Sequence, residues 1–69
     1  MNRTIDARGL SCPQPLILTT RAMKEPGGFD VIVDNPAARE NIVRMLKDRF
    51  GLAPEVIEAG RDITLRINR

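Results

Sequence analysis

The sequence predicts an α+β fold, a two-layer α/β sandwich in which two helices cover one face of a mixed four-stranded sheet. Two proline-marked helix starts and two runs of alternating apolar residues are the observations that predict it. The expected order is β-α-β-α-β-β, within one domain that spans residues 1–69. A chain of this length has room for one small core and for no second domain.

The first half of the chain predicts a short strand over residues 3–7 and a helix that begins at Pro13. Proline is favoured at the first helical position because its missing N–H would be unpaired there. Helical spacing predicts one apolar face made of Leu16, Ile17, Thr20 and Met23. Leu18 is expected to face away from the sheet, and Pro26-Gly27-Gly28 ends the helix.

A second strand is predicted over residues 29–34, and Asn35 is expected to cap a second helix. The apolar stripe of this helix contains Ala38, Ile42, Met45, Leu46 and Phe50. Glu40 and Arg44 lie opposite it, at a spacing that favours an ion pair. Gly51 is expected to end the helix. Because the chain has little else to bury, the stripe is interpreted as core rather than as a partner-binding face.

The last two strands are predicted to form a hairpin through a turn at 59–61. The segment 53–58 is the weaker strand, and Pro54 predicts that it lies at an edge of the sheet. The final strand alternates Ile63, Leu65 and Ile67 with Thr64, Arg66 and Asn68.

Composition excludes several classes of chemistry. The chain has one Cys and no His, so we expect no intramolecular disulfide, no resident metal or cofactor and no serine-histidine-aspartate triad. With 11 basic and 9 acidic residues and no Trp or Tyr, it is expected to contact nucleic acid only indirectly, if at all. It contains no secretory signal and no membrane-length apolar run, and a lone thiol fits a reducing compartment, so we expect a cytoplasmic protein.

The single thiol lies where a helix is predicted to begin. If Pro13 is the first helical residue, Cys12 is the N-cap, where the positive end of the helix dipole favours a thiolate. Pro13 and Pro15 remove two first-turn donors, and the N–H groups of Gln14 and Leu16 remain. We therefore expect a modest lowering of the pKa of the Cys12 thiol.

A buried structural role for Cys12 is an equally good interpretation of this local pattern, because free cysteine is often a small core residue. If the thiol is functional, the chain offers it neither a histidine base nor a second cysteine. A lone thiolate can still accept a sulfur atom from a persulfide and pass it to a partner. Both steps are displacements at sulfur.

The segment Asp6-Ala7-Arg8-Gly9-Leu10-Ser11-Cys12-Pro13-Gln14-Pro15 resembles the signature of the TusA/SirA/YedF family of small sulfur-carrier proteins. Its hallmark is a Cys-Pro-x-Pro element at the start of the first helix, after an Asp-x-x-Gly-Leu segment. Length and element order agree over the whole chain. The segment Val33–Asn41 looks most like the YedF branch.

The resemblance implies that Cys12 accepts the persulfide and that the residues around it support the loop. The supporting positions are Asp6, Gly9, Leu10, Pro13, Gln14 and Pro15. Gly9 is interpreted as the residue that allows the loop to turn, Leu10 as an apolar anchor, and Asp6 as a hydrogen-bonding residue at the end of the strand. Arg8 is either a contact for an anion or partner, or an exposed loop cation.

Family membership would also imply partners, namely a cysteine desulfurase or other sulfur-relay proteins. Members of such families relay sulfur towards tRNA thiolation, molybdenum-cofactor assembly, and sulfur or selenium metabolism. Leu10 and Leu18 are the candidates for the docking surface around Cys12. The alternative is a non-enzymatic regulatory module that binds protein or RNA through its arginines, or a family member that acts only as an interaction domain. The oligomeric state, the donor and the acceptor are left open by the sequence.

Overall fold

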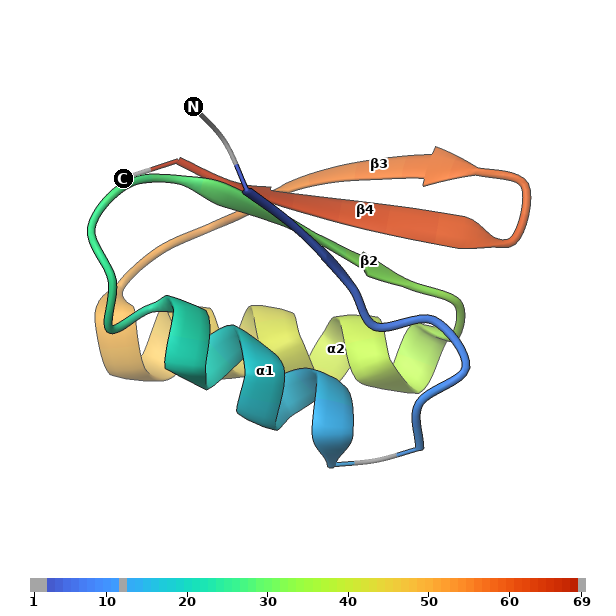
Figure 1. The fold of residues 1–69 in the computed structure, drawn as a ribbon, viewed down its shortest axis with the longest axis horizontal. Coiled ribbons are helices and arrows are strands. Elements are labelled where there is room, and N and C mark those ends of the chain that lie inside the picture. Colours follow the sequence, from blue (N-terminus) through green and yellow to red (C-terminus); the bar gives the residue numbers. More distant parts are fainter. Residues whose placement is uncertain (1–2, 12, 69) are drawn as a thin grey trace.

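The fold is a two-layer sandwich in a computed structural model that describes residues 3–11 and 13–68 (Figure 1). Its elements are β1 (Arg3–Asp6), α1 (Gln14–Ala22), β2 (Phe29–Val33), α2 (Pro36–Met45), the π-helical turn η1 (Leu46–Phe50), β3 (Glu55–Ala59) and β4 (Asp62–Ile67). This order confirms the predicted β-α-β-α-β-β arrangement. Within the described residues, no helix is long and apolar enough to cross a membrane.

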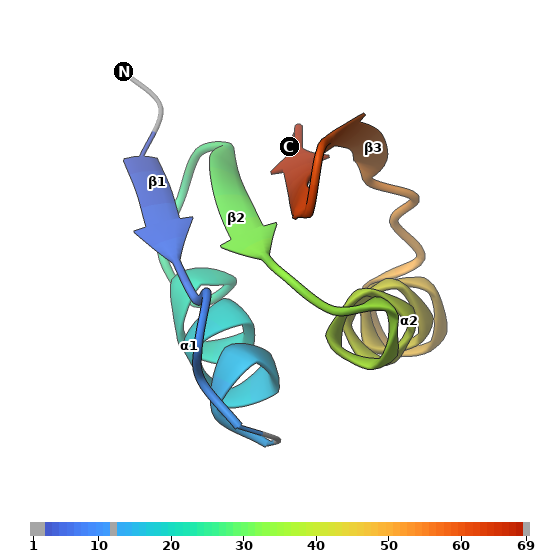
Figure 2. The same cartoon turned by 90° about the vertical axis from the view of Figure 1, so that its right-hand side faces the viewer.

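The sheet is mixed and has the spatial order β1-β2-β4-β3. β1 runs parallel to β2, whereas β4 is antiparallel to both β2 and β3. Both helices lie under the same face of the sheet, as Figure 2 shows along the strands. β1 and β3 are therefore the two edges, and the prediction of an edge position for the weaker hairpin strand is confirmed.

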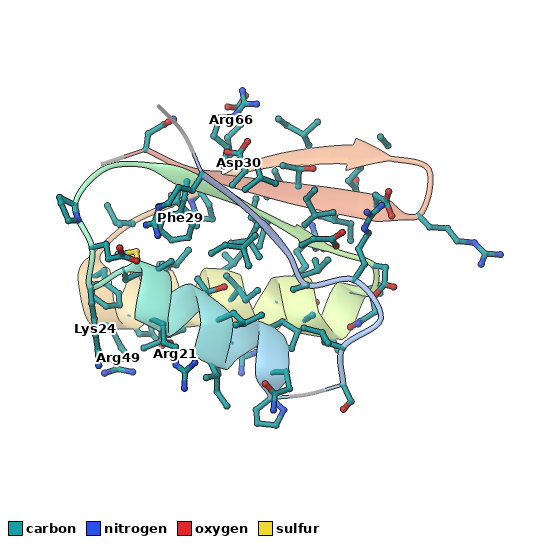
Figure 3. All side chains as sticks on the ribbon, viewed as in Figure 1. Arg21, Lys24, Phe29, Asp30, Arg49 and Arg66 are labelled. Atoms are coloured by element: carbon teal, nitrogen blue, oxygen red, sulfur yellow. The ribbon has the colours of Figure 1, made fainter. Side chains whose placement is uncertain are left out.

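The core lies between the sheet and the helices. Alternate residues of the two central strands are buried, namely Phe29, Val31, Val33, Ile63, Leu65 and Ile67. Each such aliphatic or aromatic side chain contributes about 1.5–3 kcal/mol when it leaves water. On the opposite face of the sheet Arg66 pairs with Asp30 across 3.4 Å, far from the helices (Figure 3). The period-two pattern thus separates core from solvent as predicted.

The structure corrects two predictions about the first helix. α1 begins at Gln14, one residue later than predicted, because Pro13 has non-helical backbone angles (φ −104°, ψ 23°). Its buried residues are Pro15, Thr19 and Ala22, followed by Met23 at the C-cap, so of the predicted face only Met23 is fully buried and Leu16 is partly buried against the core. Ile17 is 39% exposed. The pattern of apolar residues predicted the wrong face because the centre of the buried face is the polar residue Thr19. The Thr19 hydroxyl donates to the Pro15 carbonyl (2.9 Å), so its burial leaves no polar group unpaired.

The second helix follows its prediction closely. The Asn35 side chain accepts a hydrogen bond from the Ala38 amide (2.7 Å), which confirms the N-cap. Gly51, with φ +66°, ends η1 in the left-handed conformation that favours glycine. Phe50 was placed in the apolar stripe, but it is 39% exposed because the π-helical turn rotates the last residues out of the α-helical register.

No ion pair joins Glu40 and Arg44, although both side chains are described. Their helical spacing permits the pair, but each remains on an exposed surface where such pairs stabilise little.

The hairpin strand β3 begins two residues later than predicted, at Glu55, and all five of its residues are exposed. A two-residue loop, Gly60-Arg61, joins it to β4, with Ala59 paired to Asp62. Gly60 has φ +63°, as the first loop position of a type II′ turn requires.

Candidate functional site

The candidate site is the loop from β1 to α1, which contains the Cys-Pro-Gln-Pro motif. Cys12 lies outside the described residues, so the predictions about its pKa and its exposure are untested by the structure. The prediction that Cys12 is the N-cap of α1 is wrong, because Pro13 takes that position. On either side of it Ser11 and Pro13 are exposed. The described part of the loop leaves the carboxyl end of the edge strand β1, and Pro13 leads into the amino end of α1 (Figure 1).

The start of α1 differs from the prediction in its donors. The sequence suggested that the Gln14 amide remains available to the sulfur. In the structure this amide donates to the Ser11 carbonyl (2.9 Å) instead. Pro13 occupies the N-cap position and makes no side-chain capping bond. The first turn of α1 contains no acidic residue to offset the positive end of its dipole. The helix therefore still presents a positive end towards the motif.

Pro15 is a buried member of the motif and not only a loop-shaping residue. Together with Pro13 it lines a narrow crevice against Ala38 and Asn41 of α2. The second proline therefore fixes the start of α1 against α2. A substitution here would disturb the packing of the two helices as well as the loop.

Main-chain hydrogen bonds anchor the segment before the motif. The Ala7 amide donates to the Ile32 carbonyl (2.8 Å), which extends the pairing of β1 with β2. The Gly9 amide donates to Oδ2 of Asp34 (2.9 Å), in the loop after β2. Gly9 has φ +75°, a backbone conformation in which any residue with a side chain would be strained. This agrees with the interpretation that Gly9 shapes the loop.

Arg8 is held by two carboxylates. Its Nε and Nη2 donate to Asp6 at 2.8 and 2.7 Å, and its Nη1 donates to Asp62 at 2.9 Å. The Asp6 carboxylate also accepts from the Arg8 amide (3.1 Å). These bonds, the side-chain bonds first, lower the pKa of Asp6 from 3.8 to about 2 and raise the pKa of Arg8. Asp6 is thus a hydrogen-bonding residue at the strand end, in line with its interpretation.

This cluster bears on the two interpretations of Arg8. Its charge is already offset by Asp6 and Asp62, so the guanidinium is a weak attractor for a further anion. Sequence reasoning missed Asp34 and Asp62 as supports of the loop. They lie 25 and 54 residues from their partners, and no local pattern marks them.

Apolar side chains are exposed on both sides of the motif. Leu10, which was interpreted as an apolar anchor and as a docking candidate, is 37% exposed. Ile17 is 39% exposed on the first turns of α1, and its amide bonds to the Pro13 carbonyl (3.0 Å). Leu18, which was expected to face away from the sheet, is half-buried and packs against the core. The apolar surface near the motif is therefore formed by Leu10 and Ile17.

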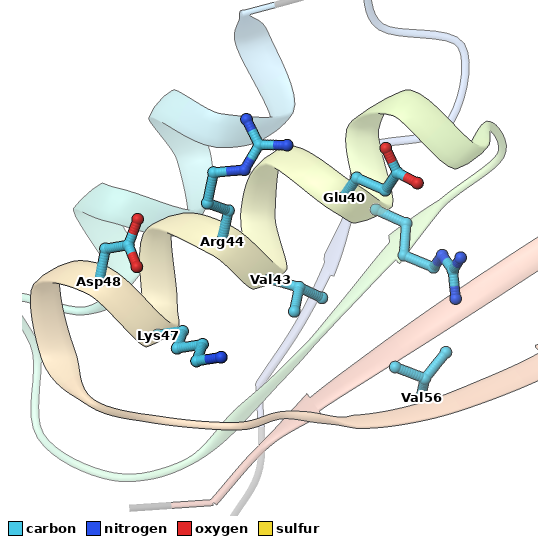
Figure 4. A pocket seen from close by; sticks show the side chains of 7 residues that line it. Glu40, Val43, Arg44, Lys47, Asp48 and Val56 are labelled. Atoms are coloured by element: carbon cyan, nitrogen blue, oxygen red, sulfur yellow. The ribbon is translucent and has the colours of Figure 1, made fainter.

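A wider hollow of the described surface lies elsewhere. It is a groove of about 520 Å³ between α2 and β3, with Val43 and Val56 facing each other across it (Figure 4). β3 and the motif loop belong to opposite edges of the sheet, so this groove is separate from the candidate site. Among the described residues no group of Asp, Glu, His or Cys side chains could hold a metal ion.

Basic side chains gather at the carboxyl ends of the two helical segments. Arg21 occupies the last turn of α1, and Lys47 and Arg49 belong to η1. Figure 3 shows Arg21, Lys24 and Arg49 at this end of the molecule. Cations at helix carboxyl ends complement the helix dipole, which gives these residues a local role without an RNA ligand.

Comparison with known proteins agrees with the fold and with the family that the sequence resembles. The model of the family described as "Sulfurtransferase TusA" matches residues 3–69. The chain belongs to the TusA sulfurtransferase family. The fold also resembles the crystal structure of a SirA-like protein from Desulfitobacterium hafniense, with a TM-score of 0.84 and 33% identity over 94% of this chain and 93% of that one. Membership of the TusA family supports a sulfur-carrier role for this protein, with partners in sulfur relay.

Proposed function

We propose that this TusA-family protein carries sulfur as a persulfide on Cys12, loaded by a cysteine desulfurase and emptied by a partner protein. The observation that supports this most directly is the braced loop around the motif. Two other segments hold its backbone and side chains: the end of β2, through Ile32 and Asp34, and the start of β4, through Asp62. Such bracing is what a loop needs to present one side chain repeatedly in the same position.

The proposed reaction consists of two displacements at sulfur. In loading, the Cys12 thiolate attacks the outer sulfur of the donor's persulfide. A new S–S bond forms to Cys12, the donor's S–S bond breaks, and the donor cysteine leaves as a thiolate. In unloading, a partner's nucleophile attacks the outer sulfur of the Cys12 persulfide, and Cys12 leaves as a thiolate. Each step exchanges one bond for another with no external oxidant.

The start of α1 supplies the electrostatic support for both steps. Cys12 is a thiolate as attacking group and again as leaving group, so an environment that stabilises the anion assists both. The positive end of α1, which has no acidic residue in its first turn, is such an environment. Arg8 acts in this proposal as a positioning residue that ties β1 to β4 through Asp6 and Asp62.

Leu10 and Ile17 form the proposed docking surface for the donor and the acceptor. Direct transfer requires the partner's reactive group to reach Cys12, so the contact must surround the motif. Exposed apolar residues beside a reactive loop are suited to such a contact.

The test is loading by a purified cysteine desulfurase with free cysteine, followed by intact mass measurement. We expect the wild-type protein to gain one sulfur atom that a reducing agent removes. Cys12→Ser should gain none, and Ser11→Ala serves as a matched control that keeps the thiol. A wild-type chain that stays unloaded while a known TusA-family carrier is loaded in the same mixture would refute the proposal.

A further inference from the structure

The outer edge of β3 presents unpaired backbone groups, and the hydrogen bonding of the sheet shows which ones. The Ala7 amide donates to the Ile32 carbonyl, so Ile32 directs its backbone groups towards β1. Backbone groups alternate along a strand, so Val31 directs its own towards β4. There its register partner is Leu65, and the two form a hydrogen-bonded pair.

The same alternation continues from β4 into β3. The backbone groups of Leu65 point to β2, so those of its neighbour Thr64 point to β3. The register partner of Thr64 in β3 is Ile57. Ile57 is thus bonded to β4, and the residues on either side of it point the other way. Val56 and Glu58 therefore direct their amides and carbonyls outward, where no described element pairs with them.

We propose that β3 pairs with β3 of a second copy of the chain, antiparallel about a twofold axis at Ile57. In that register Val56 of each copy lies opposite Glu58 of the other. Each of these two pairs exchanges two N–H···O bonds, because both residues have outward-pointing donors and acceptors. A twofold interface of this kind is self-complementary, and it joins the two sheets into one.

The side chains of β3 suit this register. Glu55 falls opposite Ala59, so no two carboxylates face each other directly. The two Ile57 side chains, each 37% exposed in the single chain, meet at the axis on the outer face of the sheet. β3 contains no lysine or proline, two of the usual devices that keep edge strands from pairing.

Charge complementarity on the helix side favours the same partner. Glu58 is in register with Ile63, which is buried beneath the helices, so the Glu58 side chain lies on the helix-facing side. In the dimer, Glu58 of the second copy lies beside Val56, at the mouth of the groove between α2 and β3. Lys47 points from the helix into this groove, whereas Glu40 and Asp48 point away from β3 (Figure 4).

The dimer leaves the motif accessible in both copies. The motif loop follows β1, at the opposite edge of the sheet from β3. The inference therefore does not depend on the sulfur-carrier function, and loading of Cys12 and pairing of β3 succeed or fail separately.

The test measures molar mass by light scattering across a dilution series that extends to millimolar protein. Cys12→Ser is the background, so that no intermolecular disulfide contributes. We expect a concentration-dependent species of twice the chain mass. Val56→Pro removes an outward donor without removing a bond to β4, and Glu58→Lys places a cation opposite Lys47. Both variants should remain monomeric, and Glu58→Lys combined with Lys47→Glu should dimerise again.

Amide hydrogen exchange locates the interface independently of any variant. The amides of Val56 and Glu58 should gain protection as the protein concentration rises. The Ile57 amide, already bonded to β4, should change little and is the internal control. A protein that stays monomeric throughout the series would overturn the proposal. So would a dimer that persists in both folded single variants, with folding checked by circular dichroism.

Discussion

At the scale of single residues, the motif loop depends on an arginine between two carboxylates. Asp6, Arg8 and Asp62 are each about half exposed, so the geometry of their bonds matters more than their Coulombic attraction. The bidentate contact of Arg8 with Asp6 sets the direction of the chain as it leaves β1. Asp62 is the first residue of β4, and its bond with Arg8 ties that turn to β4.

The ionisation of Asp6 reports on this contact. Because the pKa of Asp6 is lowered from 3.8 to about 2, its contribution to stability is complete above pH 4 and is lost as the pH falls towards 2. We expect a carboxyl ¹³C titration to place Asp6 near 2 in the wild-type protein. Arg8→Gln should return it towards 3.8, whereas Asp62→Asn should leave it low. An Asp6 that titrates near 3.8 in the wild-type protein would contradict the contact.

At the scale of elements, proline and a polar cap define where the helices begin. Asn35 has an extended backbone and caps α2, with Pro36 as the first helical residue. α1 lacks such a cap, since Pro13 stands in that position and makes no side-chain bond. The amino end of α1 therefore has no side-chain acceptor like that of α2, and its Gln14 and Ile17 amides bond to main-chain carbonyls instead.

Removal of the α2 cap has a predictable cost. Asn35→Ala loses the bond to the Ala38 amide and should lower the free energy of unfolding by about 1 kcal/mol. Chemical denaturation measures this difference. Asn35→Asp keeps an acceptor oxygen at the same place and should remain close to wild type. Equal losses in the two variants would mean that the side-chain bond contributes nothing.

At the scale of the whole molecule, one layer of helices protects one face of the sheet, and the other face remains in solvent. The pair Val56 and Leu65 shows how steeply burial changes across one register position. Leu65 is fully buried in a central strand, whereas Val56 on the edge strand is 39% exposed. Stability is therefore concentrated in β2 and β4.

Truncation of these two neighbours should give very different results. Leu65→Ala leaves a cavity in the core and should lower the free energy of unfolding by about 2–5 kcal/mol. Val56→Ala, at the directly opposite position, should cost less than about 1 kcal/mol in the monomer. Thermal and urea unfolding of dilute protein measure both. Similar losses would mean that β3 is covered in solution.

The docking surface can be tested in the same way by two equally exposed apolar residues. Ile17 lies beside the motif and Phe50 ends η1, and each is 39% exposed. Ile17→Asp should slow persulfide loading by about tenfold or more, the equivalent of about 1.4 kcal/mol of contact energy. Phe50→Asp should leave the loading rate unchanged. Equal effects on rate would remove Ile17 from the docking surface.

Local chemistry in the sequence determined the order of elements, the cap at Asn35, the end of the helix at Gly51 and the core face of the strands. These features follow from neighbouring residues, through periodicity, capping and turn conformation. The motif itself was also readable, because Cys12 and its prolines are contiguous.

Only the tertiary structure decided which side of α1 is buried, that Arg8 is held by Asp62, and that Gly9 is held by Asp34. Each of these contacts joins segments far apart in the chain, where no local spacing specifies the partner. Which backbone groups of β3 stay unpaired was settled in the same way, since strand register is fixed by the packing of the sheet on its helices.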